Sequence, residues 1–327
     1  MSSGLHICLA NDLAPPTAAH KLLLSFHFGN GPAPHDHPAI VSPHLHPIDR
    51  DMLFENWWVT DDVEFTTRDG MRVAECGDYA VVIFESDESD TDNHEQLTHD
   101  AYRRLLDVVN ATQHPQLVKI WNYIGNINEG EGDDERYRQF SVGRALAFSE
   151  SDVEDQAAPT GTGVGMMRQR GLSITALCSR CDFALAENPR QVSAFNYPRQ
   201  YGPKSPKFGR GGSVVTRSQR LHLISGTAAI VGHESMHPGD TQAQLDETLI
   251  NLDTLCHAVS EIDQAGPKLV LDEQSVLRVY LRDPDDYPAI AKSIRERLGL
   301  GPDQVVFLRG DICRQELMLE IDGVRIQ

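Results

Sequence analysis

The order of the apolar segments constrains the fold more than any other feature, because a similar series occurs twice along the chain. In the first half, the segments with strand or helix patterns fall at 71–74, 79–84, 94–112 (helix), 117–124 and 135–148 (helix). In the second half, they fall at 173–177, 182–186, 221–224, 241–258 (helix), 276–281, 287–298 (helix), 305–308 and 317–321. This order predicts an α+β protein of two similar domains, each a mixed sheet with helices.

A polar segment separates the two series. Residues 150–162 are first acidic and then small and polar, which is typical of a linker. We therefore place an N-terminal domain at 1–150, a linker at 151–165 and a C-terminal domain at 166–327. The first 50 residues are rich in proline and histidine, so only short, interrupted elements are expected there.

The composition excludes several classes of protein. The net charge of −19 argues against a general nucleic-acid binder, since phosphate binding needs a basic face. No apolar run approaches the roughly 18 residues of a membrane span, and the start lacks a signal-peptide core. Six scattered cysteines are too few for a disulfide framework in a chain of 327 residues. We expect a soluble, cytoplasmic protein.

One stretch reverses the acidic character of the chain. Between Glu187 and Glu234 there is no Asp or Glu, although the chain has 48 acidic residues. The basic residues of this stretch are Arg190, Arg199, Lys204, Lys207, Arg210, Arg217 and Arg220. Aromatic and amide side chains accompany Arg199 at 195–203, which is typical of a loop that binds a small anion. A solvated basic loop with structural tyrosines is equally compatible.

Two further segments carry candidate site residues. Arg138 and Arg144 lie about 240° apart around a predicted helix, so the two need not face one ligand, and an exposed helix would look similar. In the last strand, alternation places Glu320 opposite Leu319 and Ile321, which favours exposure of Glu320. Burial would instead raise the pKa of Glu320 and make it a proton donor near neutral pH.

Motifs for metals, nucleotides and serine nucleophiles are weak. The Cys178–Cys181 spacing has no second pair, and the glycines at 161–165 do not follow a strand as a dinucleotide fingerprint would. Histidines at 35, 37, 44 and 46 are separated by prolines, without a clear carboxylate partner. No G-x-S-x-G sequence occurs. We expect neither a metal nor a cofactor.

Several blocks, in this order along the chain, resemble the chorismatase family. They are 121–124 with 127–128, 135–140 with 143–145, 196–206, 225–228 with 232–235, and 311–321. The second half separately resembles the YjgF/RidA group, through Gly239-Asp240, Gln244, Asn251-Leu252 and the closing Glu-Ile-Asp strand. This second resemblance implies two YjgF/RidA-like domains, of which the first is degenerate and the second carries most of the site. A monomer and a trimer both remain open.

The resemblance to chorismatases implies cofactor-free removal of pyruvate from chorismate, a dianion. It implies that Glu320 is the catalytic acid. The substrate-binding residues it implies are Arg138, Arg144, Tyr197, Arg199, Tyr201, Gly226, Gly310 and Arg314. The glycines leave room for the substrate to reorient, which favours 3-hydroxybenzoate, 4-hydroxybenzoate or both as products. The alternatives are a chorismate hydrolase that forms a dihydroxy-cyclohexadiene carboxylate, a non-catalytic YjgF-like small-anion binder, and a YjgF-like imine deaminase.

Overall fold

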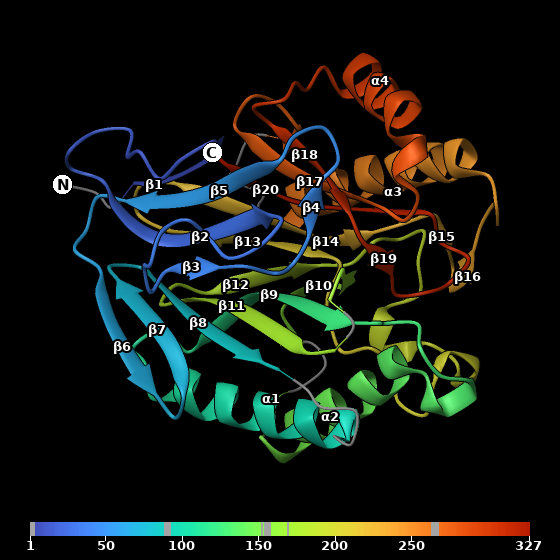
Figure 1. The fold of residues 1–327 in the computed structure, drawn as a ribbon, viewed down its shortest axis with the longest axis horizontal. Helices are drawn as coiled ribbons and strands as arrows, with labels where there is room; N and C mark the ends of the chain where they lie inside the picture. The colour runs from blue at the N-terminus through green and yellow to red at the C-terminus, as the bar shows by residue number, and fades with distance from the viewer. Residues whose placement is uncertain (1–3, 88–92, 152, 154–157, 169, 263–267) are drawn as a thin grey trace.

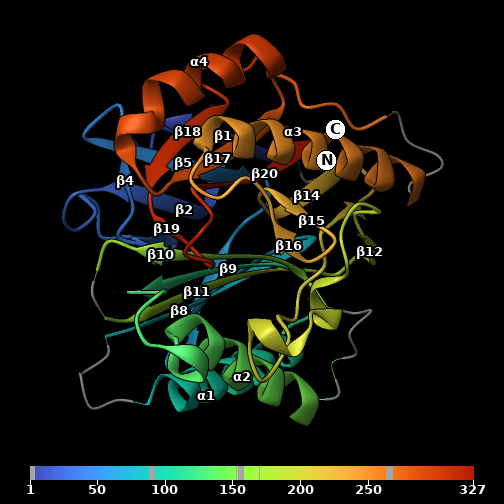
Figure 2. The same cartoon turned by 90° about the vertical axis from the view of Figure 1, so that its right-hand side faces the viewer.

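Two large sheets face each other, and a pair of helices covers the outer side of each (Figures 1 and 2). This computed structural model describes residues 4–87, 93–151, 153, 158–168, 170–262 and 268–327. The helices are α1 (His94–Asn110), α2 (Arg136–Glu150), α3 (Thr241–Ile262) and α4 (Tyr287–Leu298). Among the described residues, no helix is long and apolar enough to cross a membrane.

The first large sheet has seven strands in the order β19-β10-β9-β11-β8-β7-β6. Their bounds are β6 (Glu64–Arg68), β7 (Met71–Cys76), β8 (Tyr79–Ser86), β9 (Gln116–Gly125), β10 (Thr160–Met166), β11 (Leu172–Ser179) and β19 (Asp311–Ile312). Helices α1 and α2 pack on its outer side over one apolar cluster, which includes Tyr102, Phe140 and Phe148. Six strands come from one continuous part of the chain, and β19 comes from near the C-terminus.

The second large sheet has the order β12-β13-β14-β20-β17-β18-β4. Its strands are β4 (His46–Pro47), β12 (Phe183–Ala186), β13 (Gly211–Val215), β14 (Arg220–Thr227), β17 (Ser275–Leu281), β18 (Val305–Arg309) and β20 (Leu319–Ile326). Helices α3 and α4 cover it through leucines of α3 and apolar residues of β17, β18 and β20. Here the N-terminal part of the chain supplies the edge strand β4.

The N-terminal residues form a smaller sheet of order β1-β5-β2-β3. The strands are β1 (Leu5–Ala10), β2 (Lys21–Gly29), β3 (Ile40–Val41) and β5 (Met52–Val59), and a short pair, β15 (Ile230–Val231) with β16 (Glu234–Ser235), lies elsewhere. Phe26 and Trp57 of the small sheet share an apolar cluster with Trp121 of β9 and Tyr280 of β17. The small sheet therefore helps to join the two large ones.

Most of the predicted elements are confirmed, and so is the α+β class with two sheet-and-helix halves. The expectation of only short elements before residue 50 is wrong, because β2 is nine residues long and almost wholly buried. Periodicity missed it because Leu22, Leu23 and Leu24 are followed by a Ser-Phe-His-Phe alternation within a Pro- and His-rich setting.

The predicted linker also needs a correction. Part of it lies outside the described residues, but its end, from Thr160, is strand β10, which pairs in parallel with β9 inside the first sheet. Its glycines are packing residues, since a Cβ on Gly161 would lie 2.8 Å from Cβ of Phe208. The neighbouring strand β11 belongs to the same sheet, so this sheet takes residues from both sides of position 166.

Candidate active site

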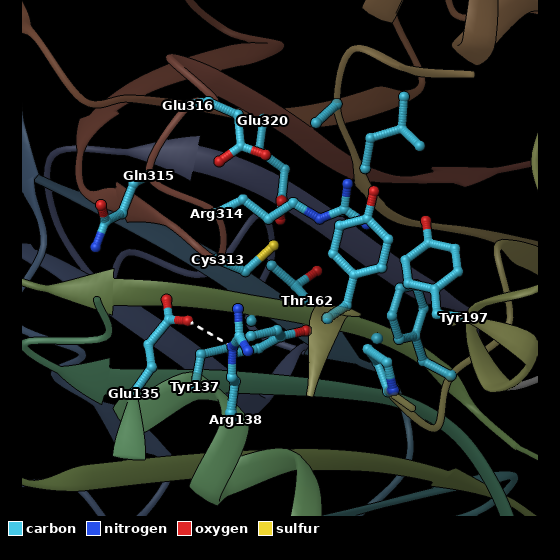
Figure 3. A pocket seen from close by; sticks show the side chains of 18 of the residues that line it. Glu135, Tyr137, Arg138, Thr162, Tyr197, Cys313, Arg314, Gln315, Glu316 and Glu320 are labelled. Atoms are coloured by element: carbon cyan, nitrogen blue, oxygen red, sulfur yellow. Dashed lines mark hydrogen bonds and ion pairs between the residues drawn. The ribbon is translucent and has the colours of Figure 1, made fainter. Parts of the chain in front are cut away.

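A cavity of about 590 Å³ opens between the two large sheets (Figure 3). Strand β10 of the first sheet, and β14 and β20 of the second, form its floor. The first turns of α2, the segment 197–210 before β13, and the loop at 313–316 form its sides. Segments far apart in the sequence therefore meet at one site.

Glu320 is the acid at the floor of this cavity. It lies on β20 between Leu319 and Ile321, whose side chains point to the other face and pack under α3 and α4. The predicted alternation is confirmed, but Glu320 is only 4% exposed, because the first sheet covers this face of the strand. Burial, reinforced by the carboxylate of Asp322, raises the pKa of Glu320 to about 8, while Lys119 and Arg210 oppose this shift.

Gly226 on β14 makes room for that acid. The pairing of β14 with β20 is irregular between Ile224 and Thr227, and Gly226 lies in this irregularity. A Cβ added to Gly226 would overlap the Oε1 atom of Glu320. Any larger residue here would therefore push the carboxyl group out of its position.

Three arginines of the cavity have unused hydrogen-bond donors. Nε and Nη2 of Arg144, Nε of Arg210 and Nη2 of Arg314 are buried and lack a partner among the residues that the structure describes. Arg144 comes from α2, Arg210 precedes β13, and Arg314 follows β19. Unpaired buried donors of positive groups are costly unless a ligand accepts from them. These arginines are suited to bind the carboxylates of an organic anion.

Two tyrosines contact the guanidinium groups of Arg210 and Arg314. The Cζ atom of Arg314 lies 3.8 Å from the ring centre of Tyr201 and 5.1 Å from that of Tyr197. Arg210 donates a hydrogen bond of 2.6 Å to the Tyr197 hydroxyl group. The predicted residues Tyr197 and Tyr201 thus line the cavity and stack against arginines.

The structure places the other predicted residues differently. Arg138 lines the cavity but is paired with Glu135, at 3.0 Å. Arg199 is not part of the lining: its side chain is 65% exposed and makes two hydrogen bonds with Asp133, of 2.9 and 2.5 Å. Gly310 also lies outside the lining, close to Gly165 and Leu45. Sequence spacing does not reveal which way a loop arginine points.

Several residues of the cavity wall are not among those predicted from the sequence. Arg210 belongs to the stretch without acidic residues, so its charge was a usable signal. Tyr137 and Cys313 lie in blocks that carry the family resemblance, and Thr162 lies in the supposed linker.

Among the described residues, no three His, Cys, Asp or Glu side chains form a group that could hold a metal ion.

Together, the fold and the cavity define a class of site: a pocket whose unpaired arginine donors suit a small organic anion, beside a carboxyl group whose burial favours its neutral form. A family described as chorismatase FkbO/Hyg5-like, N-terminal, matches residues 55–178. A 3-hydroxybenzoate synthase of Streptomyces hygroscopicus is 33% identical over an alignment of 285 residues, and the match covers 83% of this chain and 81% of that protein. The chain belongs to the chorismatase family.

Two further comparisons agree with this assignment. A chorismatase of Streptomyces rapamycinicus is 31% identical over 276 residues, covering 83% of this chain and 81% of that protein. A chorismatase crystal structure matches with a TM-score of 0.87 and 26% identity, and covers 99% of both chains.

Proposed function

We propose that this enzyme removes the enolpyruvyl group of chorismate without a cofactor, releasing pyruvate and 3-hydroxybenzoate, 4-hydroxybenzoate or both. The observation that carries the proposal is the shared cavity of buried Glu320 and the unpaired donors of Arg144, Arg210 and Arg314. Chorismate has two carboxylates for these arginines and an enol ether for the acid. The relative named 3-hydroxybenzoate synthase supports the hydroxybenzoate products.

The first chemical step is a proton transfer from Glu320 to the methylene carbon of the enol ether. The C=C electron pair forms the new C–H bond and leaves an oxocarbenium centre, which the Glu320 carboxylate can then stabilise. Attack by a hydroxyl group of the same molecule leads to pyruvate and a hydroxybenzoate, with no net water consumed. Attack by water gives pyruvate and a dihydroxy-cyclohexadiene carboxylate, the alternative product.

Roles for the wall residues follow from their contacts. Arg144, Arg210 and Arg314 bind the two carboxylates, and Tyr197 and Tyr201 border the ring. Arg138 also lines the cavity, but its guanidinium group forms an ion pair with Glu135. We keep Arg199 and Gly310 as residues that act from outside the wall, through the loop at 197–210 and through the position of β19 respectively.

The test is to incubate the purified protein with chorismate in D₂O and to convert pyruvate at once to lactate with lactate dehydrogenase. We expect one deuterium in the methyl group, since the added proton comes from solvent-exchanged Glu320. Chromatography of the ring products distinguishes hydroxybenzoates from the diene. Formation of no pyruvate at all would contradict the proposal and leave a non-catalytic anion binder.

The Glu320→Gln variant tests the role of Glu320 as the acid. It keeps the size and one hydrogen-bond acceptor of the side chain but cannot donate the proton, so turnover should fall by about 10² to 10⁴-fold. Chorismate should still bind, with an affinity measured by calorimetry that is close to the wild-type value. Turnover close to that of the wild type would remove Glu320 from the acid role.

Location and assembly belong to the same proposal. We propose a cytoplasmic enzyme, supported by six free cysteines, of which three are buried. For the assembly we propose an active monomer, because both large sheets of a single chain already contribute residues to the cavity. The test is to dilute the enzyme through the concentration range in which any oligomer dissociates. A specific activity that stays constant would support an active monomer.

A further inference from the structure

A buried lysine lies directly behind the wall of the cavity. Lys119 on β9 is fully buried, and its Nζ atom donates hydrogen bonds of 3.0 Å to Oγ1 of Thr162 and 2.6 Å to the carbonyl oxygen of Ile224. Thr162 itself lines the cavity (Figure 3). Burial lowers the pKa of Lys119 to about 8, and the neighbouring Asp322 opposes this shift. One hydroxyl group thus separates a buried ammonium group from the substrate pocket.

The partner of this lysine is Asp322, which is 1% exposed. Its Oδ2 atom lies 3.4 Å from Nζ of Lys119 and accepts hydrogen bonds of 2.5 Å from Thr162 Oγ1 and 3.1 Å from Trp121 Nε1. Asp322 is two residues after Glu320 on β20, so both carboxyl groups emerge from the same face, about 7 Å apart along the strand. Lys119, Asp322 and Glu320 therefore form one buried electrostatic unit.

The charges of this unit balance only if Glu320 is neutral. Lys119 is compensated by Asp322. A second buried cation, Arg278, is compensated by Glu55 through hydrogen bonds of 2.6 and 2.7 Å. An ionised Glu320 would then be a buried charge without a cation of its own behind the cavity, which is strongly unfavourable. Only the arginines on the substrate side could stabilise it.

From this geometry we propose that Lys119 and Asp322 are a positioning pair whose opposite charges balance each other beside Glu320: Asp322 alone favours its protonated form, Lys119 alone its ionised form, and together they leave burial to set the upper pH limit of turnover. The proposal rests on the proposed role of Glu320 as the proton donor. Removing either partner should leave the other charge unbalanced beside Glu320, with opposite effects on its proton.

All groups that face Glu320 have to be considered together. The charged or titratable groups that act on it, or on which it acts, are Asp322, Lys119, Arg210, Tyr137 and Cys313. Arg210 favours the ionised form of Glu320 while the cavity is empty. A bound dianion neutralises the arginines, which removes this influence and strengthens the hold of Glu320 on its proton. The falling limb of kcat should therefore lie at higher pH than that of kcat/KM.

The experiment compares pH profiles of kcat/KM for three variants. Asp322→Asn leaves Lys119 uncompensated, which favours ionised Glu320, so the falling limb should move down by about one pH unit. Lys119→Met leaves the Asp322 carboxylate uncompensated, which favours protonated Glu320, so the limb should move up by a similar amount. The double variant removes both charges and should return the limb close to its wild-type position.

Asp272→Asn is the matched control. Asp272 pairs with Arg325 at 2.7 Å, away from the cavity lining, so the same change of charge there should leave the profile unchanged. Limbs that stay in place in both single variants, or move in the same direction, would overturn the proposal. So would the loss of the limb in Lys119→Met, because Lys119 would then be the group that titrates.

A readout without substrate separates this proposal from the proposed function. The infrared band of the protonated Glu320 carboxyl group, identified by its absence in Glu320→Gln, can be titrated in each folded variant. Opposite shifts of that titration would support the pair even if chorismate proved not to be the substrate. An identical titration in wild type and Asp322→Asn would overturn the pair even if chorismate is cleaved. The double variant, which buries no unpaired charge, provides the comparison if a single variant does not fold.

Discussion

The carboxyl group of Glu320 lies in surroundings that oppose its ionisation. The side chain is almost wholly buried, a second carboxylate lies on the same strand face, and the buried Lys119 is already paired with Asp322. The unfolded chain loses this proton near the ordinary pKa of 4.5, whereas the folded protein keeps it to about pH 8. Between these two pH values, folding is therefore coupled to the uptake of one proton by Glu320. Burying this proton donor lowers the free energy of unfolding at neutral and higher pH.

The Glu320→Gln variant should reveal this cost. Between about pH 5 and pH 8 the native state binds more protons than the unfolded state, so wild-type stability falls as the pH rises. Glutamine has no proton to lose, so its advantage over the wild type should grow across this range and level off above pH 8, at a few kcal/mol at most. Urea unfolding at several pH values measures the difference. An advantage that does not depend on pH would contradict the raised pKa of Glu320.

The arginines of the site should separate into two groups. Arg210→Ala removes a buried donor from the cavity wall, so we expect KM for chorismate to rise by about tenfold or more, as for the loss of a charged hydrogen bond. Arg199→Ala breaks an exposed ion pair with Asp133 outside the lining, so KM should change much less. Steady-state kinetics at matched pH measures both. An equal rise of KM in both variants would indicate that Arg199 also binds the substrate directly.

At the scale of elements, the site depends on an irregularity where β14 runs beside β20. The regular ladder between the two strands breaks at Gly226, and the acid occupies the space that this break creates. On the opposite side of β20, β17 keeps a regular register, with Tyr280 opposite Glu320. The two strands that flank β20 therefore contribute differently: β17 holds the backbone of Glu320 in register, and β14 leaves space for its side chain.

Gly226→Ala tests this arrangement. The added methyl group should displace the Glu320 carboxyl group while the ladder of β17 and β20 holds, so kcat should fall by about tenfold or more and the fold should remain. Circular dichroism checks the fold, and pyruvate release measures kcat. Gly301→Ala is the control, because its Cβ would make only an ordinary contact of 3.6 Å with Oε1 of Gln304, outside the cavity lining. Equal losses in both variants would contradict the specific role of Gly226.

Much of this architecture could be predicted, and the failures have physical causes. Local periodicity identifies α1, α3, α4 and the core strands because each buries one apolar face. The burial of Glu320 could not be predicted by periodicity, since another part of the chain covers its face of β20. The same reason hides β10, whose glycines look like a linker until Phe208 and Asp311 are packed against them. The sequence also does not show which way a loop side chain points: Arg199 is exposed, whereas Arg210 lines the cavity.

At the scale of the whole molecule, the two halves are joined by exchanged strands and buried ion pairs. Strand β19 completes the first large sheet, and β4 completes the second. Arg278 of the second sheet pairs with Glu55 of the small sheet, and Lys119 of the first with Asp322 of the second. Separating the halves would break these pairs and also expose the apolar cluster that both large sheets share with the small sheet.

We therefore expect one cooperative unfolding transition. Trp57 and Trp121 lie in the apolar cluster that joins the large sheets, so tryptophan fluorescence reports on this junction, whereas far-ultraviolet circular dichroism reports on the secondary structure of both halves. The two signals should give the same urea midpoint. A fluorescence midpoint distinct from the dichroism midpoint would show that the halves unfold separately, as the predicted division near residue 151–165 would allow.

The exchanged strands also order events during synthesis. Strand β4 leaves the ribosome among the first fifty residues, but its partner β18 follows more than 250 residues later, and β19 comes later still. Neither large sheet can be completed until the end of the chain is available, and both then close at nearly the same time as the segment that carries Arg314 and Glu320. A nascent chain truncated before β18 would lack β18, β19 and β20, which leaves β10, β14 and β17 each lacking at least one neighbouring strand. We expect such incomplete chains to be prone to aggregation.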